Sequence, residues 1–167
     1  MIMKKFMMIA AMMLMSIGAF AQEAGKMAVG ATVSDYLDSD SRVALGAKFQ
    51  YSINENFRAE ADFKFYPKKY NVTVWNPTVN VHYLIPIFDK FYAYPLAGLG
   101  LWGYTVDLGE YGGSTSESTF TFKAGAGAEY YITEQFKGLF EAYYQFAKKG
   151  EMKFNKPLVS LGVAYCF

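Results

Sequence analysis

Side chains that could act as a general base, a nucleophile or a metal ligand are scarce in this chain. His82 is the only histidine and Cys166 the only cysteine among 167 residues. A histidine can serve as a general base, but no Ser/His/acid set accompanies His82, and without a second histidine or a cysteine cluster there is no metal-ligand spacing. We therefore predict a hydrogen-bonding role for His82 inside the fold, and no catalytic, metal-binding or cofactor-binding residues. Cys166 is predicted to be a small buried residue, with an intermolecular disulfide as the alternative.

Two glycine-rich segments superficially resemble phosphate-binding loops. They are "AGLGLWG" at 97–103 and "AGAGAEYY" at 124–131. A phosphate loop leads into a helix, and no helical pattern follows either segment. Both are better interpreted as strand interiors in which bulky side chains are not tolerated.

Composition points to an alternating chain rather than to a nucleic-acid-binding one. Sixteen basic and fifteen acidic residues give a net charge of +1, which provides no basic patch for nucleic acid. Hydrophobic residues make up 53% of the chain, yet the mean hydropathy is only +0.06. Apolar and polar residues must therefore be finely interleaved.

The N-terminus has the pattern of a secretory signal peptide over 1–21. Lys4 and Lys5 precede an apolar run through Met15, and Ala19-Phe20-Ala21 forms an A-x-A cleavage site. The alternative is a membrane anchor, but the run is shorter than the roughly 20 residues that a spanning helix needs. We expect residues 22–167 to form one exported domain, which a single cysteine cannot stabilise by an internal disulfide.

The exported domain has a hydrophobic period of two, which is typical of strands. In "FRAEADFKF", for example, Phe57, Ala59, Ala61, Phe63 and Phe65 alternate with charged residues. Eight such segments are predicted: 26–36, 42–53, 57–66, 72–84, 91–105, 119–132, 136–147 and 157–167.

The predicted connectors alternate between two kinds. Those after the first, third, fifth and seventh segments are long and polar, whereas those after the second and sixth, "NEN" and "TEQ", are tight turns. The connector "IPIFDK" after the fourth is longer and unusually apolar. This order predicts an antiparallel up-and-down meander. Segment 91–105 is apolar on both faces, and we expect Ala93, Pro95, Ala97, Leu99 and Leu101 on the apolar face of the sheet.

Alternation alone fits either a soluble lipocalin-like barrel or a transmembrane barrel, which have opposite faces in water. Small residues and balanced charges on the polar face favour a narrow interior. The predicted interior charges are Lys48, Arg58, Glu60, Asp62, Lys64, Lys123, Glu129 and Glu141. Aromatic residues at both strand ends of the apolar face indicate the belts of a membrane barrel. Those near the short turns are Tyr51, Phe57, Tyr83, Tyr130, Phe136 and Tyr165, and those near the long loops are Tyr36, Phe65, Trp75, Phe120 and Phe146.

The chain ends on Phe167, in phase with Leu161, Val163 and Tyr165. With this ending, the sequence resembles the small OmpX/OmpA-like outer-membrane β-barrel family over the whole exported domain. The resemblance implies an all-β, eight-stranded antiparallel up-and-down transmembrane β-barrel in a Gram-negative outer membrane, with extracellular loops and periplasmic termini. It also implies that Val163, Tyr165 and Phe167 form a signal for the barrel-assembly machinery.

Two functional hypotheses follow. In the first, the barrel is non-enzymatic, its lumen is plugged by the interior charges, and its outer loops have a structural, adhesive or surface-interaction role. In the second, it is a narrow channel or a carrier for a small ligand. An enzyme like the outer-membrane lipid A deacylases ranks third, because His82 lies near the periplasmic end. Expected partners are outer-membrane lipids and lipopolysaccharide, which the basic loops around Lys68–Lys69 and Lys148–Lys149 could contact. No cofactor, no nucleic acid and no particular extracellular ligand are indicated.

Overall fold

The computed structural model describes residues 25–37, 41–110, 112–149 and 152–167. The predicted signal peptide therefore lies outside the described residues. Within them, no helix is long and apolar enough to cross a membrane. The strands are β1 (Met27–Tyr36), β2 (Ala44–Ser52), β3 (Phe57–Lys69), β4 (Val72–Tyr83), β5 (Ile85–Phe88), β6 (Phe91–Asp107), β7 (Ser114–Tyr131), β8 (Phe136–Lys149) and β9 (Met152–Cys166).

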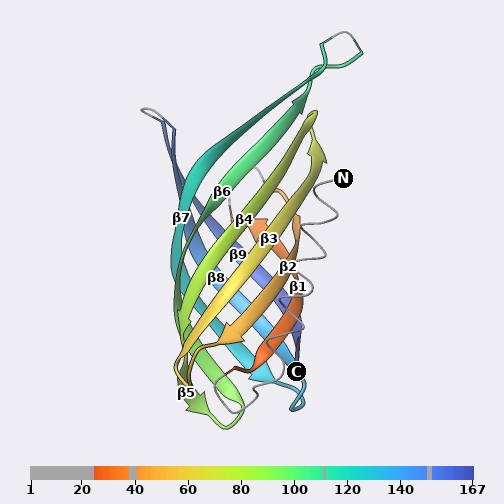
Figure 1. Cartoon of the computed structure of the whole chain (residues 1–167). Coiled ribbons are helices and arrows are strands. Elements are labelled where there is room, and N and C mark those ends of the chain that lie inside the picture. The colour runs from red at the N-terminus through yellow and green to blue at the C-terminus, as the bar shows by residue number, and fades with distance from the viewer. Residues whose placement is uncertain (1–24, 38–40, 111, 150–151) are drawn as a thin grey trace.

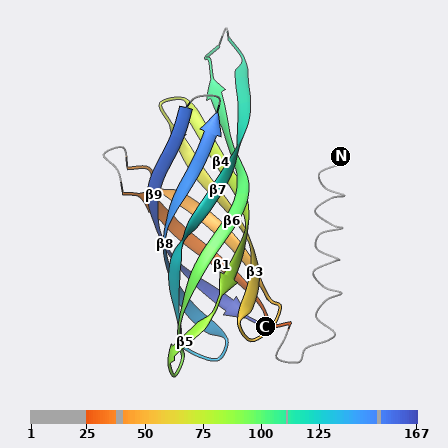
Figure 2. The ribbon, with the colours of Figure 1, turned by 90° about the vertical axis from the view of Figure 1, so that its left-hand side faces the viewer.

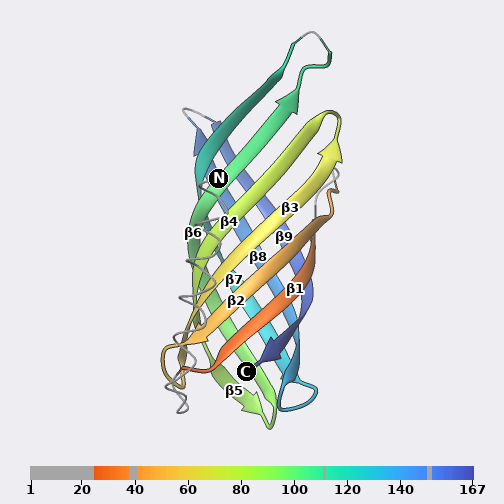
Figure 3. The same cartoon turned by 45° about the vertical axis from the view of Figure 1, so that its right-hand side comes forward.

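The long strands form a closed antiparallel barrel (Figure 1). Each long strand pairs with the next long strand, so that β4 pairs with β6, and β1 pairs with β9 to close the wall. The prediction of an eight-stranded up-and-down barrel is confirmed, with the four-residue β5 added as a short hairpin on β6. Closure also includes the last residue, because the Phe167 amide donates to the Met27 carbonyl at 2.9 Å. Figures 2 and 3 show the strands inclined to the barrel axis on both sides of the molecule.

Burial alternates along the strands as the sequence predicts. In β3, Arg58, Glu60, Asp62 and Lys64 are buried, whereas the intervening apolar residues face outward. In β6, Pro95, Ala97, Leu99 and Leu101 are exposed and Tyr94 and Leu96 are buried, which confirms the predicted face of this segment. The outer surface is therefore apolar and the interior polar.

The predicted position of one belt residue, Tyr36, is wrong. Tyr36 is only 6% exposed and faces the interior, where its ring stacks on that of Tyr66 with centroids 5.5 Å apart. The cause is phase: in β1 the even-numbered residues point inward, so the last aromatic of the strand lies on the polar side.

Three hairpins are longer than predicted, and one of them is β8–β9, in which pairing continues to Lys149 and Met152. Most of the polar segment expected to be a loop after residue 105 is strand, because β6 and β7 stay paired up to Asp107 and Ser114. Likewise β3 and β4 continue to Lys69 and Val72, joined by a two-residue turn in which Tyr70 and Asn71 both have positive φ. Such a turn matches the twist of the strands it joins. The β6–β7 hairpin rises beyond the rest of the barrel in Figure 1.

Pro77 in β4 and Pro95 in β6 lie at irregularities in strand pairing. The β4–β6 ladder is interrupted between Trp75 and Thr78, at Pro77, which has no N–H to donate. The Asn76 side-chain amide replaces this missing bond by donating to the Leu101 carbonyl at 2.7 Å. Pro95 lies where the partner of β6 changes from β4 to β5.

We predict that this repair is needed for the β4–β6 seam. Replacing Asn76 by Leu should leave a carbonyl without its donor and cost about 1–3 kcal/mol of the free energy of unfolding. Amide exchange over residues 74–78 should also become faster. Hydrogen exchange in lipid, with Asn155→Leu at an exposed position of β9 as the control, measures both. Equal exchange in the two variants would show that the side chain does not support the seam.

Candidate functional site

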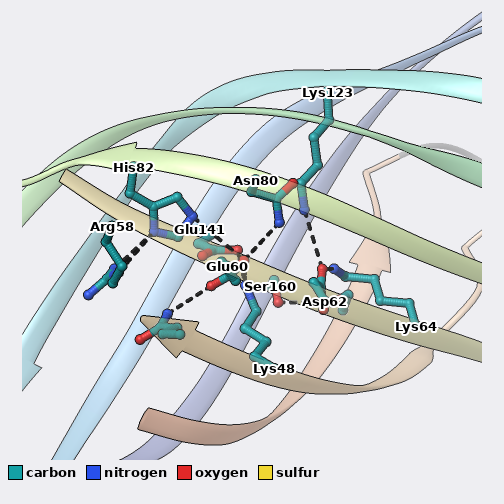
Figure 4. Close-up of polar contacts among 12 residues, drawn as sticks. Lys48, Arg58, Glu60, Asp62, Lys64, Asn80, His82, Lys123, Glu141 and Ser160 are labelled. Atoms are coloured by element: carbon teal, nitrogen blue, oxygen red, sulfur yellow. Dashed lines mark hydrogen bonds and ion pairs between the residues drawn. The ribbon is translucent and has the colours of Figure 1, made fainter. Parts of the chain in front are cut away.

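The barrel interior is the candidate site, because it gathers charged side chains from several strands. The structure places all eight predicted interior charges there, each at most 4% exposed. Lys137, which was not predicted, joins them. Figure 4 shows the side chains of Lys48, Arg58, Glu60, Asp62, Lys64, Lys123 and Glu141 extending from different strands toward one another.

At the short-turn end, Arg58 links two groups. Its Nη1 donates to Glu129 Oε2 at 2.7 Å, and the same oxygen accepts from Lys137 Nζ at 3.2 Å. Its Nε and Nη2 lie 3.2 and 3.0 Å from Nδ1 of His82. The guanidinium also lies over the ring of Tyr94, with Cζ 4.9 Å from the ring centroid. All three guanidinium nitrogens of Arg58 therefore have partners within the protein.

The middle layer is built around Glu60 and Glu141. Lys48 Nζ bridges them, at 2.6 Å from Glu141 Oε2 and 3.1 Å from Glu60 Oε1. Glu60 also accepts hydrogen bonds from the side-chain amides of Gln50 and Asn80, at 2.8 and 2.9 Å. Such dense pairing is what buried carboxylates require, because an unpaired charge out of water costs several kcal/mol.

The third layer contains Asp62 with two lysines. Asp62 Oδ2 accepts from both Lys64 and Lys123, and both ammonium groups lie over the ring of Tyr143. Among the described residues, the buried charges are five cations and four carboxylates, so the interior carries one more positive charge than negative.

Several of these contacts span the lumen rather than run along the wall. Lys48 to Glu141 joins β2 to β8, Arg58 to Glu129 joins β3 to β7, and Gln145 to Asn76 joins β8 to β4. None of these strand pairs are neighbours in the sheet. The side chains therefore meet across the barrel axis.

Glu60, His82 and Glu141 come close enough to suggest a metal site, since one ligand atom of each lies within 4.8 Å of the others. Two features disfavour it. The Lys48 ammonium already lies between the carboxylates. The Arg58 guanidinium donates to Nδ1 of His82, which puts the imidazole proton on Nε2, 3.6 Å from Glu60. The nitrogen nearest the carboxylates then has no free lone pair for a metal.

The other half of the interior is aromatic, a feature that the sequence analysis missed. Tyr36, Tyr66 and Trp102 pack together with ring centroids 5.3–6.0 Å apart. Arg42 lies over the Tyr66 ring and donates to the carbonyls of Pro67 and Val72. Phase could have revealed this layer, since Tyr66 continues the inward series of Arg58 to Lys64.

The same phase rule could have identified Lys137. It follows the outward Phe136 by one residue, just as the predicted Glu141 follows Phe140. Cys166 is half-buried with a free thiol, against Ala28, Leu139 and Ala164. The three residues of the predicted assembly signal, Val163, Tyr165 and Phe167, lie on the outer face. Their recognition by an assembly machinery stays a prediction.

The long hairpins β3–β4 and β6–β7 contact each other near their tips, at the long-loop end of the barrel. Lys68 Nζ lies 2.8 Å from Asp107 Oδ2, and the Asp107 amide donates to the Asn71 carbonyl at 2.9 Å. Both side chains of the ion pair are half-exposed. The hydrogen bond from Lys68, with one from the Gly109 amide, holds the pKa of Asp107 below its ordinary value of 3.8.

We expect Arg58→Ala to destabilise the barrel by about 3–5 kcal/mol, because it leaves a buried carboxylate with one partner fewer. Lys68→Ala removes an ion pair of similar length at an exposed position, where such pairs contribute little. Chemical unfolding from lipid vesicles compares the two variants. Similar, small losses for both would mean that the interior pairs do not stabilise the barrel.

The hairpin tie should depend on pH in a defined direction. Because the pKa of Asp107 is lowered by folding, the ion pair should persist above pH 3.8 and break as the pH falls through the lowered pKa. Lys68→Ala should raise this pKa toward 3.8, whereas Lys69→Ala should leave it unchanged. A titration of the Asp107 carboxyl carbon by NMR measures it, and equal values in all three proteins would exclude the tie.

Comparison with known proteins agrees with this geometry. The N-terminal β-barrel domain of Pseudomonas aeruginosa OprF is similar, with a TM-score of 0.72 at 18% identity over 87% of this chain and 100% of that one. Neisserial surface protein A has a TM-score of 0.69 at 18% identity, covering 86% and 97%. Ail, the attachment invasion locus protein of Yersinia pestis, has a TM-score of 0.55 at 18% identity, covering 86% and 99%.

A search of curated proteins gave no match. At these identities the solved structures show the fold alone. The family model for the outer membrane protein beta-barrel domain, in contrast, matches residues 7–167 of the sequence itself. The chain is therefore a member of the outer membrane protein beta-barrel domain family, whose relatives are Gram-negative outer-membrane barrels.

Proposed function

We propose that this protein is a non-enzymatic outer-membrane barrel whose lumen is plugged and whose long hairpins act at the cell surface. The observation that carries the proposal is the set of ion pairs across the barrel axis, above all Lys48 to Glu141 and Arg58 to Glu129. An ion or solute moving through the lumen would have to separate them.

Two further features support a closed lumen. The aromatic layer of Tyr36, Tyr66 and Trp102 fills the interior toward the long hairpins. At the other end, a cavity of about 640 Å³ opens between the short turns, and its lining reaches Arg58, Lys137 and Gln50 but none of Lys48, Glu60 and Glu141. This cavity is the one observation that favours the alternative, a narrow channel or small-ligand carrier, and it stops at the ionic network.

A surface role is supported by the hairpins. The β6–β7 hairpin extends beyond the barrel and is held to β3–β4 by Lys68, Asp107 and the β4–β6 ladder. A tied pair of hairpins presents a defined surface, which suits recognition better than a mobile loop does. One structural relative is named for attachment and invasion, and we extend an adhesive role to this chain as part of the proposal.

In this proposal the long hairpins are extracellular, and the short turns and both termini are periplasmic. The apolar outer face contacts outer-membrane lipids, and the exposed Lys68 lies where lipopolysaccharide phosphates would be. The side chains of Lys148 and Lys149, the other predicted contacts, lie outside the described residues. Biogenesis through the barrel-assembly machinery, using Val163, Tyr165 and Phe167, belongs to the same proposal.

The test is conductance of the refolded wild-type protein in planar lipid bilayers. We expect little or no steady current, because breaking the ionic network would expose unpaired charges. Arg58→Ala should admit brief openings, since it removes one of the two cations that bind Glu129 and the guanidinium that lies between Glu129, His82 and Tyr94. Large, stable, ohmic channels in the wild type would overturn the proposal of a plugged barrel and support the channel hypothesis.

A further inference from the structure

The short strand β5 and the turn that follows it differ from the other short turns of the barrel. The β2–β3 and β7–β8 turns are polar and satisfy their own backbone groups, through Asn54 Oδ1 and Thr133 Oγ1. In β5, by contrast, all four residues are exposed, and they are apolar: Ile85, Pro86, Ile87 and Phe88. Phe88 is 73% exposed, more than any described large hydrophobic residue except Tyr70.

These side chains continue the lipid-facing surface of the barrel. Val79, Val81 and Tyr83 are the exposed apolar residues of β4, and Ile85 and Ile87 extend the same alternation past the end of that strand. Phe88 packs against Phe91 at the start of β6, with ring centroids 5.9 Å apart. The apolar stripe therefore extends beyond the belt aromatics Phe57 and Tyr83, whose rings touch edge to face.

The polar tip of the hairpin faces the other way. Asp89 and Lys90 line the cavity at the mouth of the lumen, whereas none of the four β5 residues do. The hairpin thus has a water-facing side toward the lumen and an apolar side toward the surroundings of the barrel. Its base is fixed, because the Leu84 amide donates to the Asn56 carbonyl at 2.6 Å and Asn56 donates back to the Leu84 carbonyl.

We propose that this hairpin inserts its apolar side into the headgroup layer of the periplasmic leaflet and anchors that side of the barrel to phospholipid. The inference rests on the orientation given under the proposed function. A strand inclined at about 45° descends roughly 2.3 Å per residue. Ile85 and Ile87 are two and four residues past Tyr83, which puts them about 5 and 9 Å lower. Ile85 therefore lies inside a headgroup layer roughly 5–8 Å thick, and Ile87 lies just past its outer boundary, within reach of a side chain that leans back toward lipid.

Lipid fits this surface better than an added protein strand. A strand that joins a sheet edge needs a row of free backbone donors, but β5 has four residues and Pro86 supplies no N–H. Isoleucine and phenylalanine side chains around a charged tip are instead the composition of segments that lie in a membrane interface.

The test is the depth of a spin label at position 88. Phe88→Cys is compared with Glu55→Cys, at the tip of the polar β2–β3 turn, both in a Cys166→Ala background. Ile87→Cys serves if the first variant does not refold. The labelled proteins are placed in nanodiscs of phosphatidylethanolamine and phosphatidylglycerol, and collisions with oxygen and with a water-soluble nickel complex are measured.

The label at 88 should collide several-fold less with the nickel complex, and more with oxygen, than the label at 55. Equal nickel collisions at the two sites would place the hairpin in water and overturn the proposal. Low collisions with both reagents would mean that protein covers it, as in contact between two copies, and would also overturn it. Either result would leave the conductance test of the plugged lumen unaffected, so the two proposals fail separately.

Discussion

A narrow barrel surrounded by lipid must fill its own interior, and the other features of this structure follow from that requirement. The wall sends one face of every strand inward, and the charges on that face are removed from water. They are tolerated because each lies against an opposite charge or an amide, as Lys48 does between Glu60 and Glu141. Where two lysines have only one carboxylate between them, Lys64 and Lys123 share Asp62, and both ammonium groups also lie over the Tyr143 ring. Polar pairing thus performs inside this barrel the packing role that apolar side chains have in a water-soluble core.

Alternation with a period of two was enough to predict the barrel, the face of most strand residues and the eight interior charges. It works because a strand has only two faces, so one assigned residue fixes the side of all the others. The partners across the lumen could not be predicted, since the pairing of Arg58 with Glu129 depends on the stagger between strands that are not neighbours. Tyr36 was misplaced for a related reason: an aromatic residue at a strand end suits both a membrane belt and a filled interior.

The positions of the strand ends could not be predicted from the alternation either. Past the membrane both faces of a hairpin meet water, so alternation fades, and the largely polar residues 106–107 and 114–118 resembled a loop although they form a ladder. A proline inside a strand, such as Pro77, indicates a missing hydrogen-bond donor, but the repair by the Asn76 amide depends on side-chain geometry that only the folded wall defines. The sequence showed that the "IPIF" segment is unusually apolar, and the structure shows that all four of its side chains are exposed.

Buried charges across the barrel axis stabilise one another in this structure. A double-mutant cycle with Lys48→Met and Glu141→Gln, measured as free energies of unfolding from lipid vesicles, tests this stabilisation. The two side chains come from non-neighbouring strands, so their coupling reports contact across the lumen alone. This account predicts a favourable coupling within the range of about 0.5–3 kcal/mol seen for residues in one network. Additive losses, within about 0.3 kcal/mol, would contradict it.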